Sequence, residues 1–364
     1  MKRTHLILPL IVMLSIIVVF AACTREITNV IHEEASPSSC FACHSDQETI
    51  LIAASQQWAN SKHASGLNTN RNSGSCSGCH ISEGYKDRIA GNPPGNYPNP
   101  TMIHCFTCHE PHTNSDFSLT VEDPQSLANG VIEDISLGNI CVACHVARRD
   151  VNTYVDIGSV RLSGHWGPHH GTQSDMLFAS NGFEYDGFVY QDLEFHRTLT
   201  QDGCLDCHFR TTQNFVVGGH SFNMQATIAD EPEGDTGHVE FTTILNTDAC
   251  ASCHSGLSDF NYKGIQDSVT VLADSLESIL QTAGMLDNEG HPIGGVTISA
   301  DSAGALWNWQ MINEDRSIGV HNSKYMIGLL ESAIQYMEGN LPQPSTQPPF
   351  AARKQPWAAN GETP

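Results

Sequence analysis

Apolar residues are distributed in three different ways along this chain of 364 residues. Leu6 to Phe20 form an almost unbroken apolar run, and after residue 262 apolar residues recur with the roughly 3.6-residue period of an α-helix. The long stretch between them is interrupted by proline and glycine, as in Asn92 to Pro100. Its longest helical pattern, from Thr49 to Lys62, predicts one helix. This middle stretch therefore predicts short helices in coil, with few or no strands.

The region after residue 262 predicts three helices. The first, of about five turns, ends near Gly284. A shorter one should span Ala303 to Asn313 with its apolar residues on one face. The third begins after Asn322, a residue type that can cap a helix, and ends at Gly339. The many prolines that follow predict a disordered tail.

The N-terminus has the pattern of an export signal. Lys2 and Arg3 precede the apolar run, and two alanines precede Cys23. This arrangement resembles a bacterial lipoprotein signal, in which the cysteine is lipidated and becomes the first residue of the mature chain. Thr24, where inner-membrane lipoproteins carry Asp, favours the outer membrane by the same resemblance. The alternative is an uncleaved membrane helix, but the run is shorter than the roughly 17 to 25 residues that a span needs.

Twelve of the thirteen cysteines occur in six copies of Cys-x-x-Cys-His. At this spacing two thiols can bond to the two vinyl groups of one haem, while the adjacent imidazole becomes the fifth ligand of its iron. Six copies are a strong signal for six covalently bound c-type haems. The copies are Cys40/Cys43/His44, Cys76/Cys79/His80, Cys105/Cys108/His109, Cys141/Cys144/His145, Cys204/Cys207/His208 and Cys250/Cys253/His254.

Disulfides and zinc are the alternative interpretations of these cysteines. Disulfide frameworks have irregular spacings, whereas all but one of the cysteines here follow one pattern. A zinc site needs a second pair of ligands at a fixed distance, and nothing in it requires a histidine after each Cys-x-x-Cys. Haem therefore explains the repeat best. Six large apolar cofactors would also let a chain with 40% hydrophobic residues fold without a conventional core.

The second ligand of each iron decides what such a protein can do, because an iron with two protein ligands passes electrons and an iron with one can also bind a substrate. Of nineteen histidines, six belong to the motifs and His5 belongs to the signal. Twelve remain for six positions, which favours two histidines on every iron. They are His32, His63, His104, His112, His165, His169, His170, His196, His220, His238, His291 and His321.

Local context ranks six of these as second ligands: His63, His112, His169, His196, His220 and His321. His63 lies just upstream of the second motif, and Pro111 turns the chain so that His112 is directed toward a neighbouring haem. His169 belongs to the insert after the fourth motif, where His165 or His170 could serve instead.

The other three are placed by their positions along the chain. His196 and His220 complete the region of the fifth and sixth motifs, and His321 would attach the C-terminal helices to a haem. His104 and His238 are reserves, whereas His32 and His291 are expected to have no ligand role.

The formal charge of −23 argues against nucleic acid as a partner, because no basic patch is present to neutralise phosphates. The simplest explanation is that acidity keeps an exported protein soluble. A basic partner, or a positively charged mineral or metal-ion surface, is the alternative.

Several passages are similar to multihaem c-type cytochromes of bacteria that respire on extracellular acceptors. They are Trp58 to His63, Cys108 to His112, His165 to Gly171, Gly218 to His220 and Val320 to Tyr325. The resemblance implies low-spin, low-potential haems with two histidine ligands, linked in a relay across or beyond the outer membrane. It also implies partners among other redox proteins of the cell envelope, such as an outer-membrane porin or cytochrome.

Two other functions stay open. Val320 to Tyr325 also resembles the ammonia-forming pentahaem nitrite reductases, but the Cys-x-x-Cys-Lys motif that typically binds their catalytic haem does not occur here. An enzyme of this kind, or one resembling hydroxylamine oxidoreductase, would need one open haem. Some hexahaem cytochromes instead polymerise into conductive filaments, and acyl chains on Cys23 argue against that assembly.

The sequence therefore predicts an exported electron carrier with no catalytic residues, anchored by lipid at the periplasmic or cell-surface side of the outer membrane. The expected fold is mainly coil with short α-helices wrapped around a stack of six covalent haems, with a helical C-terminal segment and few or no strands. Association with a second copy stays open. The predicted divisions are a signal peptide (1–22), a tether (23–39), a multihaem domain (40–262), a helical segment (263–338) and a proline-rich tail (339–364).

Overall fold

The computed structural model describes residues 49–65, 69–110, 117–155, 158–192, 195–210, 214–229 and 241–339. The chain divides into two units, Met1–Glu48 and Thr49–Pro364, and all described residues belong to the second. The signal, Cys23, the tether and the first motif with Cys40, Cys43 and His44 lie outside the described residues. So do His112 and the tail from residue 340.

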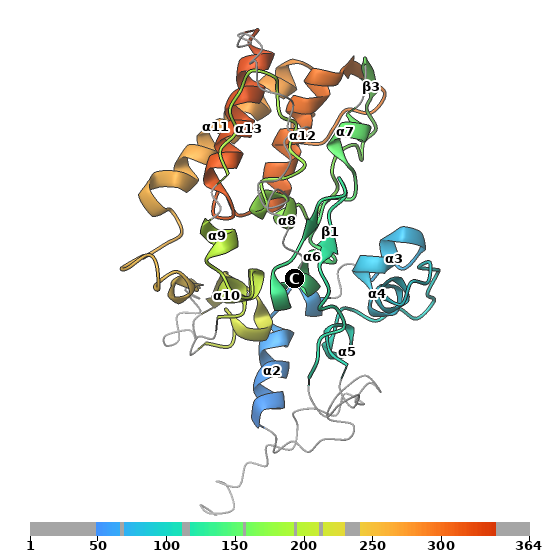
Figure 1. Ribbon diagram of the computed structural model, residues 1–364, viewed down its shortest axis with the longest axis vertical. Helices are drawn as coiled ribbons and strands as arrows, with labels where there is room; N and C mark the ends of the chain where they lie inside the picture. Colours follow the sequence, from blue (N-terminus) through green and yellow to red (C-terminus); the bar gives the residue numbers. More distant parts are fainter. Residues whose placement is uncertain are drawn as a thin grey trace, which may run out of the picture. The chain divides into compact units, whose positions relative to one another are not determined.

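Short helices separated by coil make up the region of the haem motifs (Figure 1). The predicted first helix is present as α2, Thr49–Ala59. The elements that follow, in chain order, are η2 (His63–Ser65), α3 (Gly74–His80), α4 (Ser82–Ile89), α5 (Cys105–Cys108), β1 (Gln125–Ser126), β2 (Ile132–Glu133), η3 (Ser136–Gly138), α6 (Asn139–Val142), α7 (Val151–Tyr154), β3 (Ser159–Arg161), α8 (Gln173–Leu177), α9 (Phe195–Thr198), α10 (Cys204–His208), η4 (Gly219–Ser221), β4 (Gln225–Ala229), β5 (Phe241–Leu245), η6 (Thr247–Ala249) and η7 (Tyr262–Gly264).

Strands are few and short, as the sequence predicts. Among the described residues they form three two-stranded antiparallel sheets, β1 with β2, β3 with β6 (Thr297–Ser299), and β4 with β5. The β3–β6 sheet pairs Val160 with Ile298, so it joins the insert after the fourth motif to the C-terminal region.

The three C-terminal helices are confirmed. They are α11 (Ile265–Thr282), α12 (Ala300–Asp315) and α13 (Ser323–Met337). Asn322 caps α13 as predicted, because its side chain accepts a hydrogen bond from the backbone N–H of Tyr325 at 3.3 Å. Helix α12 is longer than predicted, since Ser299 caps it and accepts a hydrogen bond from the N–H of Ser302 at 3.1 Å.

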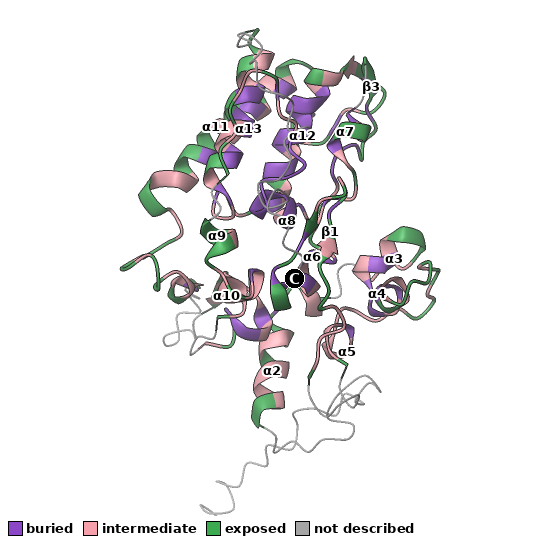
Figure 2. Ribbon diagram, viewed as in Figure 1, coloured by how far each residue is buried: buried purple, intermediate pink, exposed green. Residues whose placement is uncertain are grey.

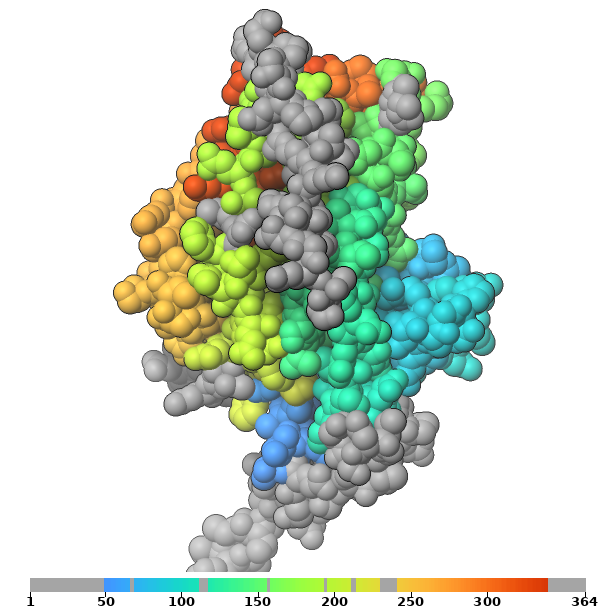
Figure 3. Space-filling model, in the orientation of Figure 1, coloured from blue at the N-terminus to red at the C-terminus, as the bar shows by residue number. Residues whose placement is uncertain are grey.

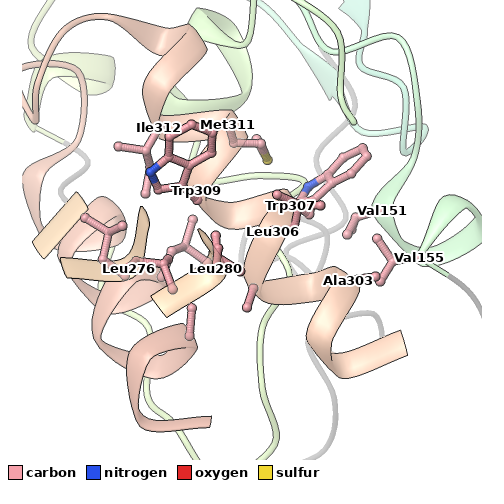
Figure 4. Packing of buried hydrophobic residues seen from close by; sticks show 14 of the residues in the cluster. Val151, Val155, Leu276, Leu280, Ala303, Leu306, Trp307, Trp309, Met311 and Ile312 are labelled. Carbon is pink, nitrogen blue, oxygen red and sulfur yellow. The ribbon is translucent and has the colours of Figure 1, made fainter. Parts of the chain in front are cut away.

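A conventional hydrophobic core surrounds α12, which corrects the expectation that cofactors alone would fill the interior. Buried residues lie on every side of this helix rather than on one face, as expected for a central helix (Figure 2). Leu276 and Leu280 of α11 lie on the side of Trp309 and Ile312 (Figure 4).

Residues of the insert between the fourth and fifth motifs complete this core. Val151 and Val155 lie on the side of Trp307 (Figure 4), and the indole N–H of Trp307 donates to the carbonyl of Asn181 at 2.8 Å. Tyr154 stacks on Trp166, with ring centroids 5.5 Å apart. The insert therefore packs with the C-terminal helices, and this packing fixes the segment that carries His169.

Apolar packing is sparser around the motifs themselves. The second buried cluster contains only Leu127, Ile135, Val142, Leu177 and Phe178. In the space-filling view, α3 and α4 form a lobe of the surface (Figure 3). Within the described part of the chain, no helix has both the length and the apolar character to cross a membrane.

Replacing Leu276 by alanine should destabilise the protein by about 2–5 kcal/mol, because it opens a cavity beside a fully buried side chain. The matched control is Val271→Ala in the same helix, where the side chain is 68% exposed and the expected cost is within about 0.5 kcal/mol. Denaturant unfolding of the haem-loaded protein measures both. Equal losses from the two variants would contradict this description of the core.

Candidate cofactor-binding site

The described Cys-x-x-Cys-His motifs lie in or beside single turns of helix. The second to fifth motifs overlap α3, α5, α6 and α10, and the sixth follows η6. Residues three positions apart lie on one face of a helical turn, so the two thiols of a motif are on the same side. The histidine then follows at the end of the turn. This local structure suits attachment of one flat cofactor by two thiols and one imidazole.

None of the ten cysteines among the described residues is in a disulfide. Nor do the described ranges contain a group of three or more His, Cys, Asp or Glu side chains arranged to hold a metal ion. The thiols are thus available for covalent attachment in all five described motifs.

Cys253 of the sixth motif differs from the other predicted attachment sites. It is exposed, whereas the remaining nine described cysteines are partly buried, including Cys250 of the same motif. Cys253 lies in a turn after η6, and the preceding residues Ala251 and Ser252 are exposed as well. The Ser252 hydroxyl donates to its sulfur at 3.8 Å. The bond of Cys253 to a haem stays a prediction.

Each described motif histidine has a second histidine ring at almost the same distance. The ring centroids are 6.2 Å apart for His80 and His169, His109 and His220, and His145 and His63. They are 6.3 Å apart for His208 and His321, and for His254 and His196. Five of the six predicted second ligands therefore lie opposite a motif histidine.

This separation fits one iron held between two imidazoles. A metal–imidazole bond of about 2.0 Å on each side, with about 1.1 Å from each nitrogen to its ring centre, separates two opposed rings by about 6.2 Å. The residues present therefore fit a haem between each pair.

Hydrogen bonds at Nδ1 orient three of these rings. The Nδ1–H of His109 donates to the carbonyl of Phe117 at 2.7 Å, and that of His208 donates to Phe222 at 2.9 Å. His196 donates in the same way to Val320 at 2.7 Å. A carbonyl only accepts, so Nδ1 carries the proton and Nε2 is left with the lone pair that binds a metal.

Two further rings are held by side chains. His145 Nδ1 lies 3.2 Å from Oε1 of Gln173. His321 Nδ1 lies 2.6 Å from Oδ1 of Asp315. Burial alone would lower the pKa of His321, but the adjacent Asp315 carboxylate outweighs it and raises the pKa above its usual range.

Burial lowers the pKa of His63, His169 and His220 to about 4, with smaller contributions from neighbouring positive charge. Burial also lowers the pKa of His145 and His208. These imidazoles are therefore neutral at pH 7, and the neutral ring is the form that binds a metal.

The other described histidines have different surroundings. His104 caps α5, because its Nδ1 accepts a hydrogen bond from the N–H of Phe106 at 3.3 Å. His170 lies 2.7 Å from Glu314 with 61% of its side chain exposed, and the exposed His291 lies 3.5 Å from Asp287. Of the three histidines in the insert, His169 is the one whose ring faces a motif histidine.

Sequence position alone is a poor guide to which ring faces which motif. His63 precedes the second motif but faces His145 of the fourth. His220, which the sequence grouped with the fifth and sixth motifs, faces His109 of the third. Sequence reasoning also missed three residues that bind the motifs or their paired rings, namely Arg88, Gln173 and Asp315. Nothing in the sequence indicates that they contact Gly78, His145 and His321.

Arg88, in α4, joins the second and fourth motifs. Its Nε donates to the carbonyl of Gly78 at 2.8 Å, and its Nη2 donates to that of Ala143 at 2.9 Å. The thiols of Cys79 and Cys144 are close enough for each to shift the pKa of the other. Since these sulfurs would attach to the edges of their haems, cofactors at these two motifs would be neighbours.

The fourth motif also touches the fifth. A Cβ added to Gly138 would lie 2.7 Å from the carbonyl oxygen of Asp202 and 3.2 Å from the backbone nitrogen of Cys204. The thiols of Cys141 and Cys204 are close enough for each to shift the pKa of the other. The two chain segments approach as closely as glycine allows.

Charge interactions between thiols extend this arrangement. Cys108 of the third motif interacts with Cys141 and Cys144, and Cys207 of the fifth motif interacts with Cys250 and Cys253 of the sixth. The fourth motif is therefore close to the second, third and fifth, and the sixth is close to the fifth.

Phe222 contacts rings that belong to three of the histidine pairs. Its ring centroid is 5.6 Å from that of His63 and 6.2 Å from that of His220, and its carbonyl accepts the hydrogen bond from His208. Its backbone φ of +56° lies in the left-handed region, which costs energy for a residue other than glycine. The surrounding contacts hold this conformation in place.

Comparison of the sequence with known proteins gives one relative, found in two strains. An alignment of 249 residues, covering 56% of this chain, is 22% identical to the C-type polyheme cytochrome OmcB of Geobacter sulfurreducens. Over this stretch the chain is similar to a multihaem c-type cytochrome. The alignment covers 31% of OmcB, so the chain spans about a third of the relative it matches. No protein-family model matches the chain.

Two solved structures have a partial likeness to this one. The outer cell wall cytochrome OcwA has a TM-score of 0.45 at 17% identity, over 77% of this chain and 49% of OcwA. The undecaheme cytochrome from the S-layer of Carboxydothermus ferrireducens has a TM-score of 0.39 at 16% identity, over 80% of this chain and 40% of that one. Neither score is high enough to assign a shared fold.

Replacing Gly138 by alanine should destabilise the protein by about 1–3 kcal/mol, because the new methyl group would push the fourth and fifth motifs apart. Gly164→Ala is the control, since an added Cβ there meets nothing within 4 Å. Denaturant unfolding of the haem-loaded protein compares them. The close approach would be refuted by a Gly138 variant as stable as the control.

Proposed function

We propose that this chain is an electron carrier of the cell envelope that holds six c-type haems, each between two histidines. The observation that carries the proposal is the constant separation of 6.2–6.3 Å in five histidine pairs drawn from distant parts of the chain. Sequence similarity to a polyhaem cytochrome supports it independently.

The pairs support one second ligand for each described motif. Each haem would be attached through the two cysteines of its motif and ligated by the motif histidine. The second ligands would be His169 for the second motif, His220 for the third, His63 for the fourth, His321 for the fifth and His196 for the sixth. His44 and His112, outside the described residues, would form the remaining pair.

The residues of the chain would serve conduction in two ways. A haem with two histidine ligands supplies an iron that changes oxidation state without gaining or losing a ligand. The carbonyls and side chains at Nδ1 hold the rings in fixed orientations, so little rearrangement accompanies the change. Arg88 and Gly138 hold the second, fourth and fifth motifs side by side, which shortens the transfer from one site to the next.

An enzyme acting on a nitrogen compound is the alternative. It would need an iron with a free position, and each of the five described motif histidines faces a second ring. Those pairs favour electron transfer over catalysis at these five sites.

We further propose that the chain is a lipoprotein of the outer membrane, on its periplasmic or cell-surface side. The basic start, the apolar run and Cys23 support an export signal with lipidation, and covalent haem attachment also takes place after export. Its partners would be other redox proteins of the envelope, such as a porin or another cytochrome, and electrons would pass toward extracellular acceptors.

Replacing His63 by alanine should leave the iron at the fourth motif with one protein ligand. Low-temperature EPR of the oxidised wild-type protein should show low-spin signals only, and the variant should gain a high-spin signal equivalent to one iron. His291→Ala is the control, because that exposed ring faces no motif histidine. A wholly low-spin spectrum for the His63 variant would remove this ligand assignment.

Replacing Cys23 by alanine should abolish acylation while leaving the haem motifs intact. The variant should then leave the membrane fraction and appear in the soluble envelope fraction, and mass spectrometry should still show six haem additions. If the variant stays with the membrane, a lipid on Cys23 is not the anchor.

A further inference from the structure

Asp315 is a buried carboxylate at the end of α12, and its side chain is fully excluded from solvent. Its Oδ1 accepts a hydrogen bond from His321 Nδ1 at 2.6 Å. Its Oδ2 accepts one from the backbone N–H of Ser317 at 3.1 Å and one from the Ser317 hydroxyl. Both oxygens act only as acceptors, which is the pattern of an ionised carboxylate.

No Lys or Arg neutralises this charge among the described residues. The ion pair recorded for Asp315 there is with His321, and the neighbouring Arg316 pairs with Glu314 at 3.7 Å. The carboxylate also interacts electrostatically with His208. It therefore acts on both rings of the pair assigned to the fifth motif.

His321 differs in this respect from the other oriented ligands. His109, His196 and His208 donate to backbone carbonyls, and His145 faces the neutral amide of Gln173. Within the described residues, carboxylates also lie beside His170 and His291, but neither ring faces a motif histidine. Among the hydrogen-bonded ligand rings described, His321 is therefore the one whose Nδ1 faces a carboxylate.

A carboxylate at Nδ1 changes the electronics of the iron that Nε2 binds. It draws the Nδ1 proton toward itself, so the ring becomes a stronger donor and stabilises the ferric state. The buried negative charge acts in the same direction, because it favours the more positively charged iron in a medium of low dielectric constant. Both effects lower the reduction potential.

We propose that Asp315 makes the haem of the fifth motif the one of lowest potential among the five described sites. This inference rests on the proposed function. The fifth motif lies between the fourth and the sixth in the contacts described above. Electrons that pass between the haems of motifs two to four and the haem of motif six would then cross a site of lower reduction potential. Asp315 is a positioning residue that acts through His321.

The test is a spectroelectrochemical titration of the full-length, haem-loaded protein and its Asp315→Asn variant. The lowest-potential component should move upward by at least tenfold in its reduction equilibrium constant, which is about 59 mV for one electron. Glu314→Gln is the matched control. It removes the same charge one residue away from Asp315, at a carboxylate that pairs with His170, and His170 faces no motif histidine. In the Glu314 variant, the reduction equilibrium constant of the lowest-potential component should change less than threefold.

Ser317→Ala gives a second variant with the opposite sign. It removes the hydroxyl that shares the Asp315 carboxylate, so the carboxylate should pull harder on His321 and the lowest component should move downward. An unshifted lowest component in both variants, or equal shifts for the Asn variant and the Glu314 control, would overturn the inference. Missing haems or a high-spin wild-type EPR spectrum would instead count against the proposed function.

Discussion

The structure depends on one geometric constraint, the placement of histidine rings from distant segments at one constant separation. In the proposed function, two metal–nitrogen bonds would fix this separation, so each pair would act as a crosslink of set length. The pairs join distant segments: His63 with His145, and His109 with His220. With little regular structure around the motifs, these crosslinks would define the fold there, much as a structural metal does in small domains.

The helical core supplies the rigid support for this arrangement. Thr172 donates its hydroxyl proton to the carbonyl of Met311 at 2.7 Å, and Gln173 donates to the carbonyl of Glu314 at 2.9 Å. These bonds fix the end of α12 against the segment that contacts His145. The same helix end carries Asp315, so one packed element orients rings from both the fourth and the fifth motifs. Packing in the core and the properties of the sites are thereby connected.

The sequence predicted the elements whose causes are local. The three C-terminal helices follow from apolar period and capping, and the coil character of the rest follows from proline and glycine. It missed the core around α12, because Val151 and Val155 join that core from more than a hundred residues away. The ring pairings are non-local for the same reason, since they join segments that lie far apart in the sequence. The roles of Asp315 and Arg88 could not be predicted, because the sequence around each residue does not indicate which groups it contacts.

An experimental structure of the haem-loaded protein tests the central claim most directly. The account predicts an iron between His145 and His63, and likewise between the rings of the other four described pairs, with each porphyrin attached through its Cys-x-x-Cys. A described motif whose iron has an open sixth position, or a second ligand other than the assigned histidine, would contradict it.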